Sequence, residues 1–147
     1  MNSLRNKTIL GGIVGTIVMT AFMYIAPSFG LPKMNPAEMI SSMLGVPIVA
    51  GWVILFLVGI AVAFSYPDHF TKYSRQSNPL ANGILFGLSI FIVVEIIIFA
   101  IAAIKGPMPT FDKAMILPMV GFLVAYILYG IAVALIVKNS KWYNYRH

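Results

Sequence analysis

The sequence contains no cysteine and very few charged residues. Its 147 residues include ten Lys and Arg, four Asp and Glu, and two His. Without cysteine the chain cannot form disulfide bonds, thiolate nucleophiles, iron–sulfur clusters or thiolate zinc sites. The two histidines, His69 and His147, lie outside the apolar segments, which excludes a bis-histidine haem within a bilayer. We therefore expect no cofactor and no enzymatic activity, because few polar groups remain to converge on a substrate.

Apolar residues are present in large excess. Hydrophobic residues make up 60% of the chain and charged residues 10%, and the formal net charge is +6. A water-soluble domain of this length could not bury so much apolar surface. The basic residues are scattered in short connections beside apolar runs, which is typical of membrane topology and argues against nucleic-acid binding. The first expected partner is therefore the lipid bilayer.

Four apolar segments are long enough to cross a bilayer: residues 8–26, 46–66, 80–104 and 115–137. A spanning helix needs about 20 apolar residues, and a lone segment in hydrocarbon satisfies its backbone only as a helix. The fold class is therefore all-α, an integral membrane four-transmembrane-helix bundle that forms one domain over residues 1–147. No small-residue cleavage site follows the first segment before Pro27, so we expect an uncleaved anchor.

The basic residues predict which side each end occupies. Seven lie on the side of the two termini: Arg5, Lys7, Lys72, Arg75, Lys138, Lys141 and Arg146. Three lie on the other side: Lys33, Lys105 and Lys113. Because cytoplasmic loops carry the excess of Lys and Arg, the N- and C-termini are expected in the cytoplasm.

The first outer loop contains the signals of a short helix. Asn35, Pro36 and Glu38 fit an N-cap, a first-turn proline and an acidic third residue. Apolar residues follow at helical spacing, so we expect a short interfacial amphipathic helix over residues 35–44. Such a helix covers the outer end of the bundle or, alternatively, forms a lid over a site.

The two halves of the sequence resemble each other. Residues 59–63 and 130–134 both read Gly-Ile-Ala-Val-Ala, and Met-Leu-Gly at 43–45 is echoed by Met-Val-Gly at 119–121. This pattern predicts two similar helical hairpins in a 2+2 parallel repeat, related by an axis along the membrane normal. The repeat either builds a stable bundle or places a shared site between the halves.

Small residues recur four positions apart in all four segments. Such spacing lets helix backbones approach closely in lipid, where no hydrophobic drive brings them together. They are expected to pack helices within the chain or against a partner. The helix-packing residues are Gly11, Gly12, Gly15, Gly59, Ala63, Gly83, Gly87, Gly130 and Ala134.

Glu95 is the one ionisable side chain deep in a predicted span. Because an ionised carboxylate in hydrocarbon costs several kcal/mol, Glu95 should be protonated, paired or facing a hydrated cavity. Tyr126 and Thr16 lie at about the same depth, and we predict a hydrogen bond between Glu95 and Tyr126. A neutral interhelical hydrogen bond is the favoured interpretation; a proton or cation site and a buried contact with a partner subunit are the alternatives.

Methionines gather on the predicted outer side. Met39 and Met43, and likewise Met115 and Met119, are spaced four apart and so share a helical face. Paired thioethers suit soft Cu(I). Methionine is also a common apolar filler, so no metal site is expected and copper remains an alternative.

The first 60 residues resemble a known family. Residues 12–23 read Gly-x-x-x-Thr-x-x-Met-Thr-x-x-Met, residues 26–34 read Ala-Pro-x-x-Gly-Leu-Pro-x-Met, and Gly51-Trp52 opens the next span. This pattern is similar to a small four-helix prokaryotic membrane protein family of unknown function. The resemblance implies a multi-pass protein of a prokaryotic cytoplasmic membrane, with an association with respiratory or electron-transfer machinery. It transfers no catalytic residue.

The expected function is that of a non-enzymatic accessory or scaffolding subunit. Its Gly/Ala-rich faces would pack against a larger membrane complex, such as a respiratory one, or against further copies of the chain. The alternative is a small proton- or ion-coupled transporter or conductance protein that uses Glu95. Cu(I) handling by the outer methionines is the third hypothesis.

Overall fold

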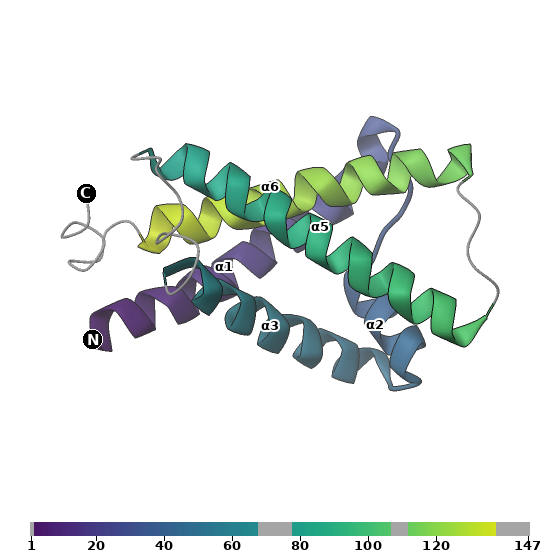
Figure 1. Ribbon diagram of the computed structural model, residues 1–147, viewed down its shortest axis with the longest axis horizontal. Helices are drawn as coiled ribbons and strands as arrows, with labels where there is room; N and C mark the ends of the chain where they lie inside the picture. The colour runs from purple at the N-terminus through teal and green to yellow at the C-terminus, as the bar shows by residue number, and fades with distance from the viewer. Residues whose placement is uncertain (1, 68–77, 107–111, 138–147) are drawn as a thin grey trace.

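Figure 1 shows a computed structural model, which describes residues 2–67, 78–106 and 112–137. Within these stretches all regular structure is helical. The four long helices are α1 (Asn2–Ile25), α3 (Ile48–Ser65), α5 (Pro79–Lys105) and α6 (Ile116–Val137). Each is long and apolar enough to cross a membrane. The prediction of an all-α chain with four such helices is therefore confirmed.

The helix bounds follow the predicted spans closely, except at the amino terminus. α1 begins at Asn2, six residues before the predicted start at Thr8. Hydropathy marks the segment suited to hydrocarbon, whereas a helix continues wherever its backbone hydrogen bonds can form. The Thr8 hydroxyl donates to the Leu4 carbonyl at 2.8 Å, which is a contact that only a helical first turn provides.

The predicted short helix over residues 35–44 is present as α2 (Pro36–Leu44). The Asn35 side chain caps it, since its Oδ1 accepts from the Ala37 amide at 3.1 Å and the Glu38 amide at 3.4 Å. The helix ends at Gly45, whose φ of 68° is the left-handed conformation that glycine adopts without strain. The N-cap signals in the sequence were sufficient to place this element.

The described residues also form two short 3₁₀ helices, η1 (Ala26–Phe29) and η3 (Lys113–Met115). After η1 the chain turns at Gly30, with φ 88°, and Met34 then packs against Gly121 of α6. A side chain at Gly121 would collide with the Met34 thioether. The Gly-Leu-Pro-x-Met pattern therefore folds the chain back onto α6.

The long helices pack in a chain of neighbours. α6 contacts both α1 and α5, α1 also contacts α3, and α2 lies against α3. α5 and α6 cross near one end of the molecule and diverge toward the other, where α2 lies (Figure 1). In the predicted repeat α1 corresponds to α5 and α3 to α6, so the contact of α1 with α6 should have an equivalent between α5 and α3. That equivalent is lacking, because α3 and α5 make little contact. The two hairpins therefore do not pack together as equivalent units.

The small residues predicted to pack helices all lie at contacts within the chain. An added Cβ at Gly12 would lie 2.7 Å from the Ile60 Cα, and at Gly83 it would lie 2.6 Å from the Ile131 Cα. Gly11 and Gly15 face α6, Gly59 faces α1, and Gly87 and Gly130 face each other; Ala63 and Ala134 are fully buried. These faces assemble the bundle itself, so the expectation that they form the surface for a partner is not supported.

The two ends of the bundle are formed by different helices. α1 begins and α6 ends at one end, here called the terminal end, while α2 and the last turn of α5 lie at the other, the α2 end (Figure 1). Of the ten basic residues, Lys72, Arg75, Lys138, Lys141 and Arg146 lie outside the described residues. Because α1 begins and α6 ends at the same end of the bundle, the arrangement agrees with a chain that crosses a membrane an even number of times.

Candidate functional site

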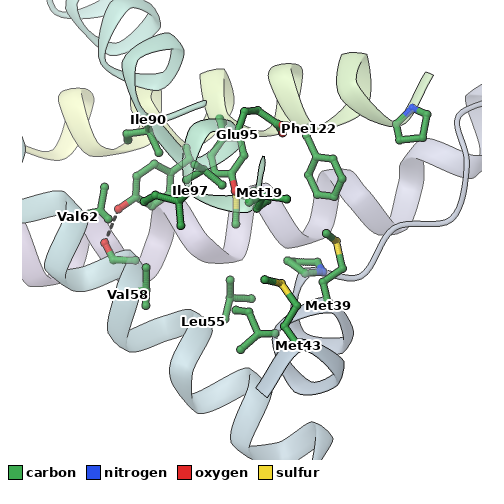
Figure 2. A pocket seen from close by; sticks show the side chains of 18 of the residues that line it. Met19, Met39, Met43, Leu55, Val58, Val62, Ile90, Glu95, Ile97 and Phe122 are labelled. Carbon is green, nitrogen blue, oxygen red and sulfur yellow. Dashed lines mark hydrogen bonds between the residues drawn. The ribbon is translucent and has the colours of Figure 1, made fainter. Parts of the chain in front are cut away.

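A cavity of about 660 Å³ lies where α5 departs from the rest of the bundle. α1 and α6 form its back, α3 and α5 its sides, and α2 its end (Figure 2). It exists because α3 and α5 make little contact with each other. The sequence did not predict this cavity, since the apolar residues that line it look like any lipid-facing or buried helical face.

Both ends of the cavity are closed by specific contacts. Toward the terminal end, the rings of Tyr66 and Phe86 meet edge to face, with centroids 5.1 Å apart, and so join α3 to α5. At the α2 end, the Lys105 ammonium donates to the Met43 carbonyl at 3.0 Å, which ties the end of α5 to α2. Between these two contacts the described residues of α3 and α5 make little contact, so the cavity opens there toward the surface that would face lipid.

The length of the cavity matches half of a bilayer. On α5 its lining runs from Ile90 to Ile101. Eleven residues at about 1.5 Å each give roughly 16 Å, and one leaflet of a 30 Å hydrocarbon core is about 15 Å thick. The cavity therefore occupies one half of the apolar thickness of the bundle, the half next to α2.

The walls are almost entirely apolar. The lining side chains that carry hydroxyl or carboxyl groups are Thr16, Glu95, Tyr126 and Tyr129. Two of them have partners within the bundle: the Thr16 hydroxyl donates to the Gly12 carbonyl at 2.8 Å, and the Tyr129 hydroxyl donates to the Gly59 carbonyl. Thr16 is therefore not available to Glu95, although both line the same cavity.

Glu95 of α5 and Tyr126 of α6 line the same cavity. The Tyr126 backbone lies against Gly87, eight residues and about 12 Å along α5 from Glu95. Helical side chains lean toward the N-terminus of their helix, and α5 and α6 run in opposite directions, so these two side chains lean toward each other.

The predicted hydrogen bond between Glu95 and Tyr126 is absent. Neither side chain hydrogen-bonds to any residue in the stretches that the structure describes. The sequence predicted one depth for both residues by counting inward from the helix ends. Because α5 and α6 cross obliquely, residues at the same count on the two helices do not lie at the same depth. The tilted ring of Phe91, 6.2 Å from that of Tyr126 between centroids, holds the phenol in place.

The methionines surround the α2 end of the same cavity. Met39 and Met43 extend into it from α2, with Met19 of α1 opposite (Figure 2). Met115 of η3 and Met119 of α6 also contribute to the lining. The residues described contain no cluster of three His, Cys, Asp or Glu side chains that could hold a metal ion. The thioethers therefore form a polarisable apolar lining without a charged ligand.

Comparison with known proteins identifies a family and no individual relative. Residues 4–141 match a family of unknown function, DUF6789. No curated protein and no solved structure matches the chain. The match covers all four long helices and the cavity between them. The chain therefore belongs to the DUF6789 family, as the resemblance of its first 60 residues to an uncharacterised family led us to expect.

Proposed function

We propose that the protein is inserted in the cytoplasmic membrane through α1, α3, α5 and α6, with both termini in the cytoplasm and α2 at the outer interface. The four apolar helices and the basic-residue count support this topology. In this orientation the cavity lies in the outer leaflet. A cysteine-accessibility scan checks the topology, because a cysteine at Glu38 should react with an impermeant reagent in intact cells.

The two hairpins are similar units joined asymmetrically. The repeated Gly-Ile-Ala-Val-Ala segment packs α3 against α1 through Gly59 and packs α6 against α5 through Gly130. Each copy therefore performs the same task within its own hairpin, which supports a duplicated origin. The halves then associate mainly through α1 and α6, and the cavity takes the place of the second interface.

The function that the cavity supports best is non-enzymatic binding of a small lipid-soluble molecule. Its volume of about 660 Å³ falls within the roughly 300–1,000 Å³ of typical ligand pockets. The cavity therefore has the volume of a pocket for one small molecule from the outer leaflet.

The same walls argue against ion conduction and catalysis. An ion path needs a continuous series of polar groups, and an active site needs several convergent ones. Thr16 and Tyr129 are already engaged with backbone carbonyls, which leaves Glu95 and Tyr126 as isolated polar groups in the lining. Two polar groups are sufficient to orient a bound lipid-soluble molecule.

A matched pair of variants tests the proposal. Val94 lines the cavity, whereas the adjacent Val93 is 54% exposed on the outside of α5. Val94→Phe should fill the cavity and reduce the lipid-soluble material that co-purifies with the protein about tenfold, measured by mass spectrometry of organic extracts. Val93→Phe should leave that material unchanged. Equal extracts from the two variants would refute the proposal.

A second candidate is the role of accessory subunit in a larger membrane complex, such as a respiratory one. One observation favours it: among the long helices α5 packs mainly against α6, and it leaves large side chains such as Ile92 and Ile96 exposed along its outer face. A partner would cover this face, since the small-residue faces are used internally. The test is a pull-down in mild detergent, followed by mass spectrometry. Recovery of the protein alone across several detergents would remove this candidate.

A further inference from the structure

We propose that the ligand is a neutral lipid-soluble molecule, with a chain about one leaflet long and a hydroxyl or carbonyl group held between Glu95 and Tyr126. This inference rests on the proposed function, because it names the chemistry of the molecule that the cavity binds. Three features of the cavity lead to it.

The first feature is unused hydrogen-bonding capacity. Glu95 and Tyr126 line an apolar cavity and make no hydrogen bond within the described parts of the chain. In hydrocarbon a carboxyl group is most stable when protonated, and it then both donates and accepts. A phenol does the same. A single ligand oxygen placed between the two side chains would satisfy both.

The second feature is the depth of these polar groups. Glu95 lies six residues, or about 9 Å, from the outer limit of the lining at Ile101. The wall on α5 between them contains only Ile97 and Ile98. A polar group must therefore be carried on an apolar chain to reach Glu95. An ordinary phospholipid would place its headgroup at the interface and leave methylene groups beside the carboxyl.

The third feature is the distribution of charge. The cation bordering the cavity is Lys105 at its outer end, where it is bonded to the Met43 carbonyl. Among the residues that the structure describes, no basic side chain lines the cavity at the depth of Glu95. A fatty-acid carboxylate would meet another acidic group there and no counter-charge, which disfavours an anionic ligand. A neutral alcohol or ketone needs no counter-charge.

Farnesol and farnesene provide a matched pair of probes, because they share an isoprenoid skeleton and differ in the hydroxyl group. Binding of tritiated farnesol to the purified protein, with unlabelled farnesene as competitor, gives both affinities. One hydrogen-bonded oxygen should make farnesol bind about tenfold more tightly than farnesene. The Glu95→Leu/Tyr126→Phe double variant should bind the two equally. Glu95→Gln should keep the preference, because an amide also donates and accepts.

The outcomes separate this inference from the proposed function. If the double variant retains the preference for farnesol, or if palmitate binds as tightly as farnesol, the inferred chemistry is wrong while the cavity remains a binding site. Phospholipid as the sole material in extracts of the native protein would have the same meaning. If Val94→Phe weakens neither farnesol nor farnesene, the cavity is not the site and the proposed function also fails.

Discussion

Two neighbouring glycines of α1 offer a sharp test of how the bundle is packed. A Cβ added at Gly11 would lie 3.5 Å from the Val133 Cα, which is ordinary contact. A Cβ added at Gly12 would lie 2.7 Å from the Ile60 Cα and 3.0 Å from the Gly59 carbonyl oxygen. The obstacle at Gly12 is backbone and cannot rotate away. The same substitution, glycine to alanine, should therefore have opposite effects at adjacent positions.

The magnitudes follow from the distances. Both substitutions gain up to about 1 kcal/mol of helix propensity. Gly12→Ala must also separate α1 from α3 by about 0.7 Å to restore a contact of 3.4 Å. A gap of 0.5–1 Å loses roughly a quarter to a half of the dispersion energy of each facing pair, and overpacking typically costs about 1–3 kcal/mol. We expect Gly12→Ala to lower the free energy of unfolding by about 1–2 kcal/mol and Gly11→Ala to leave it unchanged or raise it.

The assay is unfolding of the purified protein in mild detergent by titration with sodium dodecyl sulfate. Circular dichroism reports the loss of helix over the titration. If Gly12→Ala is as stable as Gly11→Ala, then α1 and α3 do not approach as closely as described and the packing argument is refuted.

Three further predictions concern single contacts. Tyr129→Phe removes the hydrogen bond to the Gly59 carbonyl and should lower the free energy of unfolding by about 0.6 kcal/mol, the average for interhelical hydrogen bonds in membranes, in the same titration; no change would mean that the bond contributes nothing. Asn35→Ala removes the cap of α2 and should destabilise that helix by about 1 kcal/mol, seen as faster amide hydrogen exchange confined to residues 36–44; unchanged exchange there would contradict the capping role. Met39→Leu with Met43→Leu keeps the apolar lining and should leave Cu(I) affinity unchanged, measured by competition with a chromophoric chelator; a marked loss of affinity would instead support copper handling.

Much of the fold could be predicted from the sequence, because hydropathy and capping are local properties. The four long helices end within two residues of the predicted spans, apart from the start of α1, and the signals at Asn35 and Pro36 located α2. Of the polar side chains that line the cavity, the sequence drew attention to Glu95, Tyr126 and Thr16, since a lone carboxyl in an apolar run is conspicuous, but not to Tyr129. Their hydrogen bonding was not predictable, because it depends on the angle at which α5 crosses α6.

The distribution of glycine along α5 nevertheless indicates where the cavity lies. Both glycines of α5, Gly83 and Gly87, lie in its first third, and there they meet the α6 backbone closely. From residue 88 to Lys105 the helix contains no glycine and is rich in branched side chains. Branched side chains hold helix backbones apart in lipid, where close approach depends on small residues. α5 must therefore pack tightly against α6 at the terminal end and diverge from it toward α2, as Figure 1 shows.

The same reasoning predicts how the cavity could be closed. Glycines placed at Ile98 and Ile101 would continue the small-residue spacing of α5 toward its outer end, on the side that lines the cavity. The Ile98→Gly/Ile101→Gly variant should let α5 approach the bundle and lose ligand binding without filling the cavity by bulk. Glycines at Ile92 and Ile96, on the exposed face, are the control for the loss of helix propensity. If both double variants bind farnesol as the native protein does, the glycine distribution does not determine where α5 diverges.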